Sequence, residues 1–319
     1  MPTLPTTTKN PEIVAMLRRF LNCYWLRPEN AFWMVLRSQV LREVELTEPC
    51  VDISCGDGIF SFLHAGGDFD LDFDVFTSVG RLDKVRDEHA DMFDHIDQRY
   101  RPRITRQPDR TLAVGTDWKQ TLLDKAALLN LYDRLVLHDS NLPLPFEDAS
   151  FATVYCNAIY WVKNIDAFLA ETRRILQPGG KAVFEVKLDA VKEYTLEPFR
   201  NQLGDRWLEL IGRGRFETWP SMGDQPVWEK RFESAGFAVA SATPFITRTH
   251  AHIWDIGLRP IAPLLIRMAG AVTPETRRAI KADWIDLMTE LLLPITQPDF
   301  DPIGGNSGPV EVLFVLTPR

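Results

Sequence analysis

The residues best suited to chemistry lie in one short stretch, VDISCGDGIF, at residues 51–60. An apolar run ends in an acid and a turn with two glycines, and a second apolar run of helical character follows. This order is typical of a strand, a ligand-cradling turn and the start of a helix. Gly56 and Gly58 lack a Cβ, so the backbone there can approach a ligand closely. The turn predicts a ligand site only if suitable residues follow at the ends of other strands.

Such residues do follow, because apolar strands and helical patterns alternate along the chain. We predict strands at 50–54, 112–116, 135–138, 151–156 and 181–186, and helices at 59–65, 118–130 and 165–176. This alternation favours a parallel sheet with helices on both faces, which binds ligands at the carboxyl ends of its strands. Asp117, Asp139 and Asn157 end or follow three of these strands. We therefore expect them to share one site with residues 52–58.

Together these pieces resemble the class I S-adenosylmethionine (SAM)-dependent methyltransferases of the small-molecule type, with a methyltransferase-11-like core. The resemblance covers most of residues 50–187, and the run ETRRILQPGGK at 171–181 is particularly similar to the family's motif before its fifth strand. There are two departures: Ser54 stands where the family usually has its first glycine, and Ala152 where it usually has aspartate. The resemblance implies a Rossmann-like fold with a seven-stranded, mostly parallel sheet. It also implies a final strand at 310–316 that pairs antiparallel with 237–242.

The same resemblance assigns the glycine turn to the methionine part of the cofactor SAM. Backbone amides of 56–58 should meet that part, with Asp52 and Asp57 near its ammonium and sulfonium. Tyr24 and Arg27, in the aromatic N-terminal helices, are the best candidates there for closing over the ligand.

Further along the chain, Asp117 should accept hydrogen bonds from both ribose hydroxyls, and Asp139 with Ser140 should meet the adenine. Asp72 or Asp74 is the alternative acid for the ribose. The full set of expected SAM-binding residues is Tyr24, Arg27, Asp52, Ser54, Cys55, Gly56, Asp57, Gly58, Asp117, Trp118, Asp139, Ser140 and Asn157.

Composition limits the other classes of function. The chain has 319 residues, 45% hydrophobic and 25% charged, as is ordinary for a soluble globular enzyme. A net charge of −8 argues against a nucleic-acid-binding surface. The four cysteines lack metal-ligand spacing, and no apolar run is long enough for a membrane span. We expect a cytoplasmic protein without a resident metal, and the oligomeric state stays open.

We predict an N-terminal helical segment at 1–49 and a methyltransferase domain at 50–319, with insertions at about 68–110, 188–235 and 246–309. The first insertion opens DFDLDFD, which alternates like a strand with one wet face. Its sixth position is Phe73 rather than the glycine that a calcium loop needs, so a solvated, self-pairing segment is favoured over a metal site. We expect its apolar side chains to cover the mouth of the cofactor pocket as a lid.

Candidates for the chemistry on the methyl acceptor lie outside the core motifs. His250 and His252 would point the same way on an extended segment, and Tyr160 follows the fourth strand. Arg213, Arg215 and Arg259 would suit an anionic acceptor.

We expect SAM-dependent methyl transfer, most simply to oxygen, on a small molecule or a glycan precursor. The alternatives are a catalytically inactive SAM-binding protein and an NAD(P)-dependent oxidoreductase. Against the oxidoreductase, Ser61 stands where a dinucleotide turn would have its third small residue.

Overall fold

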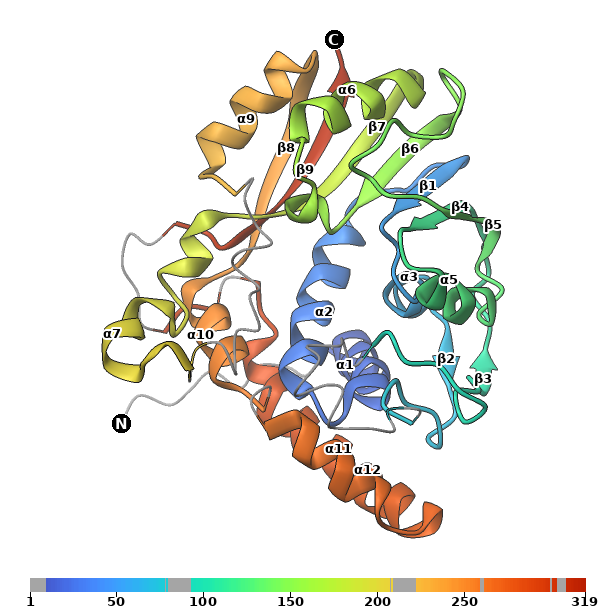
Figure 1. Cartoon of the computed structure of the whole chain (residues 1–319), viewed down its shortest axis with the longest axis vertical. Helices are drawn as coiled ribbons and strands as arrows, with labels where there is room; N and C mark the ends of the chain where they lie inside the picture. The colour runs from blue at the N-terminus through green and yellow to red at the C-terminus, as the bar shows by residue number, and fades with distance from the viewer. Residues whose placement is uncertain are drawn as a thin grey trace.

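A seven-stranded sheet organises the chain in the computed structural model (Figure 1), which describes residues 10–77, 79, 93–206, 208, 222–258, 261–298, 300–302 and 308–319. The strand order is β5-β4-β1-β6-β7-β9-β8. Neighbouring strands from β5 to β7 run parallel, and β9 runs antiparallel to both β7 and β8. The strands are β1 (Cys50–Ile53), β4 (Leu112–Asp117), β5 (Tyr132–Leu137), β6 (Phe151–Cys156), β7 (Leu176–Lys187), β8 (Phe237–Ile246) and β9 (Glu311–Pro318).

The predicted fold class is therefore confirmed, including the antiparallel last strand. The main boundary error is at β7, which begins at Leu176 rather than at 181. Leu176 already pairs with Phe151 of β6, so the glycines that follow lie inside the strand instead of ending the preceding helix.

Helices cover both faces of the sheet and bury one apolar core on each. On one face α6 and α9 pack through side chains such as Phe168 and Trp228; on the other lie α1, α2, α3, α10 and α12. The larger helices are α1 (Pro11–Tyr24), α2 (Pro28–Leu41), α3 (Ile59–His64), α5 (Gln120–Ala127), α6 (Ile165–Ile175), α9 (Gln225–Ser234), α10 (Arg248–Ile256), α11 (Ala262–Gly270) and α12 (Pro274–Leu292). Because α1 and α2 share their core with α3 and the sheet, the N-terminal segment is part of the packed structure.

The described part of the segment after α3 packs into the protein interior, and its role as a lid over the cofactor stays a prediction. In the described part of this segment, Asp68–Phe69 (β2) is a strand that pairs antiparallel with Ile104–Arg106 (β3). Phe69, Phe73 and their apolar neighbours are buried in the core that contains α1.

Polar contacts also fix this segment to the late helix α12. Asp74, the alternative ribose acid, accepts hydrogen bonds from Trp25 Nε1 at 2.9 Å and from Arg277 Nη2 at 2.8 Å. Lys281 Nζ donates to the carbonyl oxygens of Leu71 and Phe73 at 2.8 and 2.7 Å. Asp74 thus holds the segment against α1 and α12, and replacing the segment by a short linker would remove part of the core.

The described residues contain neither a membrane-spanning helix nor a cluster of metal ligands. Within them, no helix combines the length and apolar character needed to cross a bilayer. The same part of the chain contains no group of three or more His, Cys, Asp or Glu side chains arranged to hold a metal ion.

Candidate active site

The turn after β1 is built from residues with left-handed backbone. Ser54, Gly56 and Gly58 have φ of 60°, 62° and 74°. A Cβ added to Gly56 would meet no heavy atom within 4 Å, so open space lies beside it. A Cβ on Gly58 would instead lie 3.1 Å from Tyr132 Cε2, so that glycine serves close packing against β5. Of the two glycines, only Gly56 has the geometry of a ligand cradle.

Asp117 joins this turn to the next strand of the sheet. Its Oδ2 accepts a hydrogen bond from Gly56 N at 3.1 Å, and its Oδ1 accepts one from Lys119 N at 2.9 Å. Burial raises the pKa of this carboxyl above its ordinary value, against the lowering effect of these amide donors. Each oxygen of an ionised carboxylate can accept a further bond, so Asp117 retains acceptor sites for two hydroxyls. Trp118 follows with 65% of its surface exposed.

Asp52 lies beneath the turn and does not face the open space. Its Oδ2 accepts from Ser61 Oγ at 2.6 Å and from Tyr132 OH at 2.7 Å, and the residue is fully buried. Burial raises its pKa to about 6. These contacts fasten α3 and β5 to β1, in place of the expected position beside the cofactor's ammonium.

The loop after β5 carries the two residues expected at the adenine. Asp139 is exposed, and the backbone and side-chain N–H groups of Asn141, at 2.9 and 2.7 Å, lower its pKa. Ser140 Oγ lies 3.2 Å from Ser54 Oγ, so this loop meets the glycine turn. Asn141 Oδ1 accepts from Lys163 N at 2.7 Å, which links the loop to the segment after β6.

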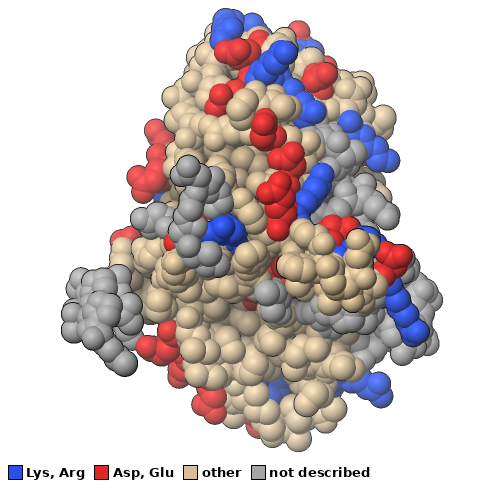
Figure 2. Space-filling view, turned by 90° about the vertical axis from the view of Figure 1, so that its left-hand side faces the viewer, with Lys and Arg blue, Asp and Glu red and all other residues tan. Residues whose placement is uncertain are grey.

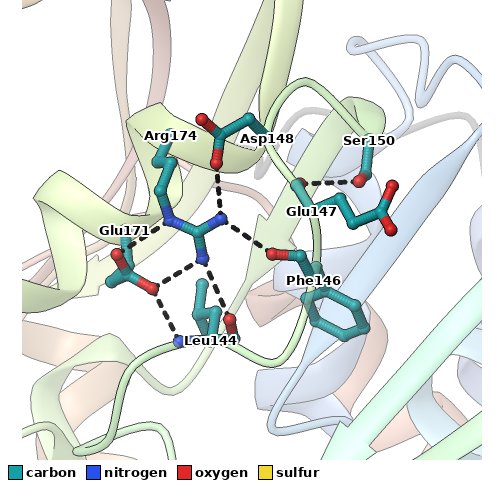
Figure 3. Close-up of polar contacts among 7 residues, drawn as sticks. All are labelled: Leu144, Phe146, Glu147, Asp148, Ser150, Glu171 and Arg174. Atoms are coloured by element: carbon teal, nitrogen blue, oxygen red, sulfur yellow. Dashed lines mark hydrogen bonds and ion pairs between the residues drawn. The ribbon is translucent and has the colours of Figure 1, made fainter.

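Arg174 of α6 holds the loop between β5 and β6 in place. Its guanidinium donates to the carbonyl oxygens of Leu144 and Phe146 at 3.0 and 2.7 Å and pairs with Asp148 at 2.9 Å (Figure 3). Glu171, one turn earlier, pairs with Arg174 and also accepts from Leu144 N at 2.8 Å (Figure 3). Glu171 and Arg174, both in the predicted motif, therefore position this loop.

The remaining expected cofactor residues surround the turn less directly. Asp57 Oδ1 accepts a hydrogen bond at 3.1 Å from the backbone N–H of Ile59, the first residue of α3. Tyr24 is buried, and burial raises its pKa, with the nearby Asp57 carboxylate adding to the effect. Arg27 is also buried, but it pairs with Glu29. Asn157 follows β6 and is partly exposed.

A buried charged cluster that the sequence analysis missed lies at the far side of this edge. Arg37 of α2 pairs with Glu311 of β9, and its Nε lies 3.2 Å from Glu185 Oε2 of β7. Glu311 Oε2 also accepts from Trp33 Nε1 at 2.8 Å. Burial raises the pKa of Glu185 to about 8. The signal in the sequence was a single charge inside each of three apolar runs.

Lys187, the last residue of β7, sits next to this cluster inside an aromatic cage. Its Nζ is 4.8 Å from the ring centroid of Trp33 and 4.9 Å from those of Tyr160 and Trp254. In the strand register Lys187 is opposite Glu311, so both side chains leave the same face of the sheet. Tyr160, a predicted catalytic residue, is thus buried beside a cation at the carboxyl end of β7.

The two histidines do not lie on an extended segment, and the prediction that they point the same way is wrong. Both are in α10, where positions two apart face different sides. His250 is fully buried; its Nδ1 accepts from Thr247 N at 3.0 Å, and its Nε2 lies 2.9 Å from Ile295 O. His250 therefore caps α10. Arg213, Arg215 and Arg259 lie outside the described residues.

Comparison with known proteins gives one family match, in which residues 99–184 match the model of a methyltransferase domain. No curated protein matches the chain. Among solved structures, the chain is similar to a possible histamine N-methyltransferase from Thermotoga maritima (12% identity, 96% of this chain and 99% of that one, TM-score 0.48). It is also similar to the geranyl diphosphate C-methyltransferase of Streptomyces coelicolor (10% identity, 89% and 77%, TM-score 0.41).

The family match covers β4, β5, β6 and most of β7, and the glycine turn, outside the match, lies at the end of β1, an inner strand of the sheet. Asp117 and Asp139 end or follow the next two strands outward, at the ligand-binding edge of the sheet. The methyltransferase-domain match over residues 99–184 supports a class I SAM-dependent methyltransferase, with SAM as its cofactor.

Proposed function

We propose that this enzyme transfers the methyl group of SAM to an oxygen atom of a small-molecule acceptor, a glycan precursor being one candidate, in the cytoplasm. The observation that carries the proposal is Lys187, whose ammonium lies in the aromatic cage at the carboxyl end of β7. The N-terminal segment 1–49 belongs to the acceptor side in this proposal, since Trp33 of α2 is part of the cage.

On the cofactor side, the described residues fit SAM. Gly56 faces open space, and Asp117 has acceptor sites for two hydroxyls at the same turn. We assign the methionine part to Gly56 with Ser54 and Cys55, the ribose to Asp117, and the adenine to the neighbourhood of Trp118, Asp139 and Ser140. Bound SAM supplies a methyl group on positively charged sulfur.

On the acceptor side, the charge of Lys187 favours some types of methyl acceptor over others. An ammonium near the reacting atom stabilises the negative charge of a hydroxyl that is losing its proton. The same ammonium repels a protonated amine, which would have to lose its proton before it could react. A hydroxyl or carboxylate acceptor is therefore favoured over an amine.

Of the three residues predicted as catalytic, Tyr160 is the one that lies at the proposed acceptor site. It shares the cage with Lys187, whereas His250 caps α10 and His252 has its ring 6.1 Å from that of Tyr194. Burial raises the pKa of Tyr160, so its phenol stays protonated near neutral pH and acts as a hydrogen-bond donor. We assign it to orienting the acceptor oxygen.

The proposal is tested by incubating the enzyme with methyl-deuterated SAM and acceptors that share one carbon skeleton but carry a hydroxyl, an amine or a carboxylate. A nucleotide sugar joins the panel as the glycan precursor. Mass spectrometry should find the label on oxygen. Transfer to the amine alone would overturn the choice of oxygen. If S-adenosylhomocysteine binds but no acceptor of any type is methylated, the inactive SAM-binding alternative gains support.

The variant Lys187→Met tests whether the cage acts on the acceptor rather than on cofactor binding. It should lower turnover of the hydroxyl acceptor by about 10-fold or more while leaving the affinity for S-adenosylhomocysteine unchanged. Lys181→Met, in the middle of β7, is the matched control and should keep full turnover. Equal turnover in both variants would remove Lys187 from the acceptor site.

A further inference from the structure

A cavity of about 400 Å³ lies away from the glycine turn, between the start of α2, the end of α10, the start of α11 and α12. Its walls are mainly apolar: Pro28, Ile253, Leu258, Ile261, Met288 and Leu292. The volume is in the range of small-molecule pockets, which are mostly apolar with a few placed polar groups. The lower part of the face in Figure 2, at the level of α11 and α12 in Figure 1, also carries few charged side chains.

One polar side chain, Glu29, lines this apolar cavity. Glu29 is only 2% exposed, and its Oε1 accepts from Arg27 Nε at 2.6 Å. Its Oε2 is buried and has no hydrogen-bond partner in the described structure. A buried carboxylate oxygen without a donor is unfavourable, so its place in a residue that lines the cavity points to a ligand that supplies one.

The charges around Glu29 decide what kind of donor is suitable. Arg27 already neutralises the carboxylate, and the positive end of the α2 dipole lies at the same place, because Pro28 begins the helix. A cationic ligand would have to give up its hydration next to the Arg27 guanidinium. A neutral donor meets no like charge, and a hydroxyl is the smallest such group.

We propose that this cavity binds an apolar molecule that carries a neutral hydroxyl group, which donates its hydrogen bond to Glu29 Oε2. The apolar body contacts Ile253, Leu258, Ile261 and Met288. This inference does not depend on the identity of the methyl acceptor, since binding can be measured without SAM.

The test uses three probes of similar size: 2-naphthol, naphthalene and 2-naphthylmethylammonium. Binding to the full chain is followed by calorimetry or ligand-observed NMR. The neutral hydroxyl compound should bind about 10-fold or more tightly than naphthalene, as a hydrogen bond to a charged acceptor implies. The cation should bind more weakly than 2-naphthol. No binding of any probe, or equal binding of 2-naphthol and naphthalene, would overturn the proposal.

Two variants locate the site. Ile261→Trp should fill the cavity and abolish binding of 2-naphthol, whereas Leu264→Trp, on the exposed surface of α11, should leave it unchanged. Both positions are exposed enough that the fold should tolerate tryptophan, which circular dichroism verifies. Equal affinity in the two variants would place the probe elsewhere.

If the 2-naphthol bound here is the methyl acceptor, a labelled methyl group will appear on it when SAM is added. If it is bound but not methylated, the cavity binds a non-reacting ligand. Failure of methyl transfer therefore leaves the binding result intact, and the two proposals can fail separately.

Discussion

Two groups of carboxylates lie at the same edge of the sheet and differ in the residues that donate hydrogen bonds to them or pair with their charge. Asp117 and Asp139 accept hydrogen bonds mainly from backbone N–H groups one or two residues away or in the adjoining turn. Glu185 and Glu311 are completely buried and meet Arg37, which comes from a helix far away in the sequence. The first group is built locally and retains acceptor sites for a ligand. The second is built by tertiary packing and holds α2 on the sheet.

This difference predicts that mutations in the two groups affect different properties. Removing an acid near the glycine turn should mainly weaken cofactor binding. Removing a member of the buried cluster should mainly reduce the free energy of unfolding, because the charges left behind remain out of water.

The largest effect is expected for Arg37→Met. Loss of the guanidinium leaves the buried carboxylate of Glu311 without its cation, which should reduce the free energy of unfolding by about 3–5 kcal/mol. Denaturant unfolding measures this change. Arg18→Met, which breaks a surface pair with Asp286, is the control and should change stability by about 1 kcal/mol or less. Similar losses in both variants would show that the cluster contributes no more than a surface ion pair.

A smaller effect, on a different property, is expected for Asp117→Ala. Loss of an ionised acceptor for the ribose hydroxyls should weaken binding of S-adenosylhomocysteine by about 1.5–3 kcal/mol. Calorimetry measures it, with Asp124→Ala on the exposed face of α5 as the control. Stability should fall less than in Arg37→Met. Unchanged affinity would mean that another acid binds the ribose.

The smallest effect, over the single pH unit proposed for the measurement, is a pH dependence from Glu185. Its pKa in the folded protein is about 8 and its ordinary value is 4.5, so the folded state holds a proton that the unfolded state has lost. Between these values stability should fall as pH rises, by about 1.4 kcal/mol per pH unit for this group. The contribution is complete below pH 4.5 and gone above pH 8.

The comparison of wild type with Glu185→Gln isolates this contribution, because glutamine does not titrate. Unfolding should be measured between pH 6.5 and 7.5, above the pKa of about 6 that burial gives Asp52. The wild type should lose stability over this range and the variant should lose less. Parallel curves would show that Glu185 is ionised in the folded protein. Glu147→Gln, at an exposed position, should follow the wild type.

Much of the fold could be predicted from short stretches of the sequence. Apolar runs with polar ends predicted β6 at its observed bounds and located the other strands of the sheet. A strand buried by neighbouring helices is apolar along its length, whichever residues cover it, so one stretch of sequence is enough to recognise it. For the same reason, Asp117 and Asp139 could be placed at the sheet edge from their positions after strands.

Only the tertiary structure decided which polar residues meet across the fold. Nothing near Glu185 in the sequence shows that Arg37 pairs with it, or that Trp33, Tyr160 and Trp254 surround Lys187. The segment after α3 illustrates the same point. Its alternating pattern shows that one face is buried, but the surface that buries it, α1 with the late helix α12, is brought there by long-range packing. The spacing of apolar residues in a segment shows that their side chains are buried. Which residues bury them depends on contacts between segments far apart in the chain.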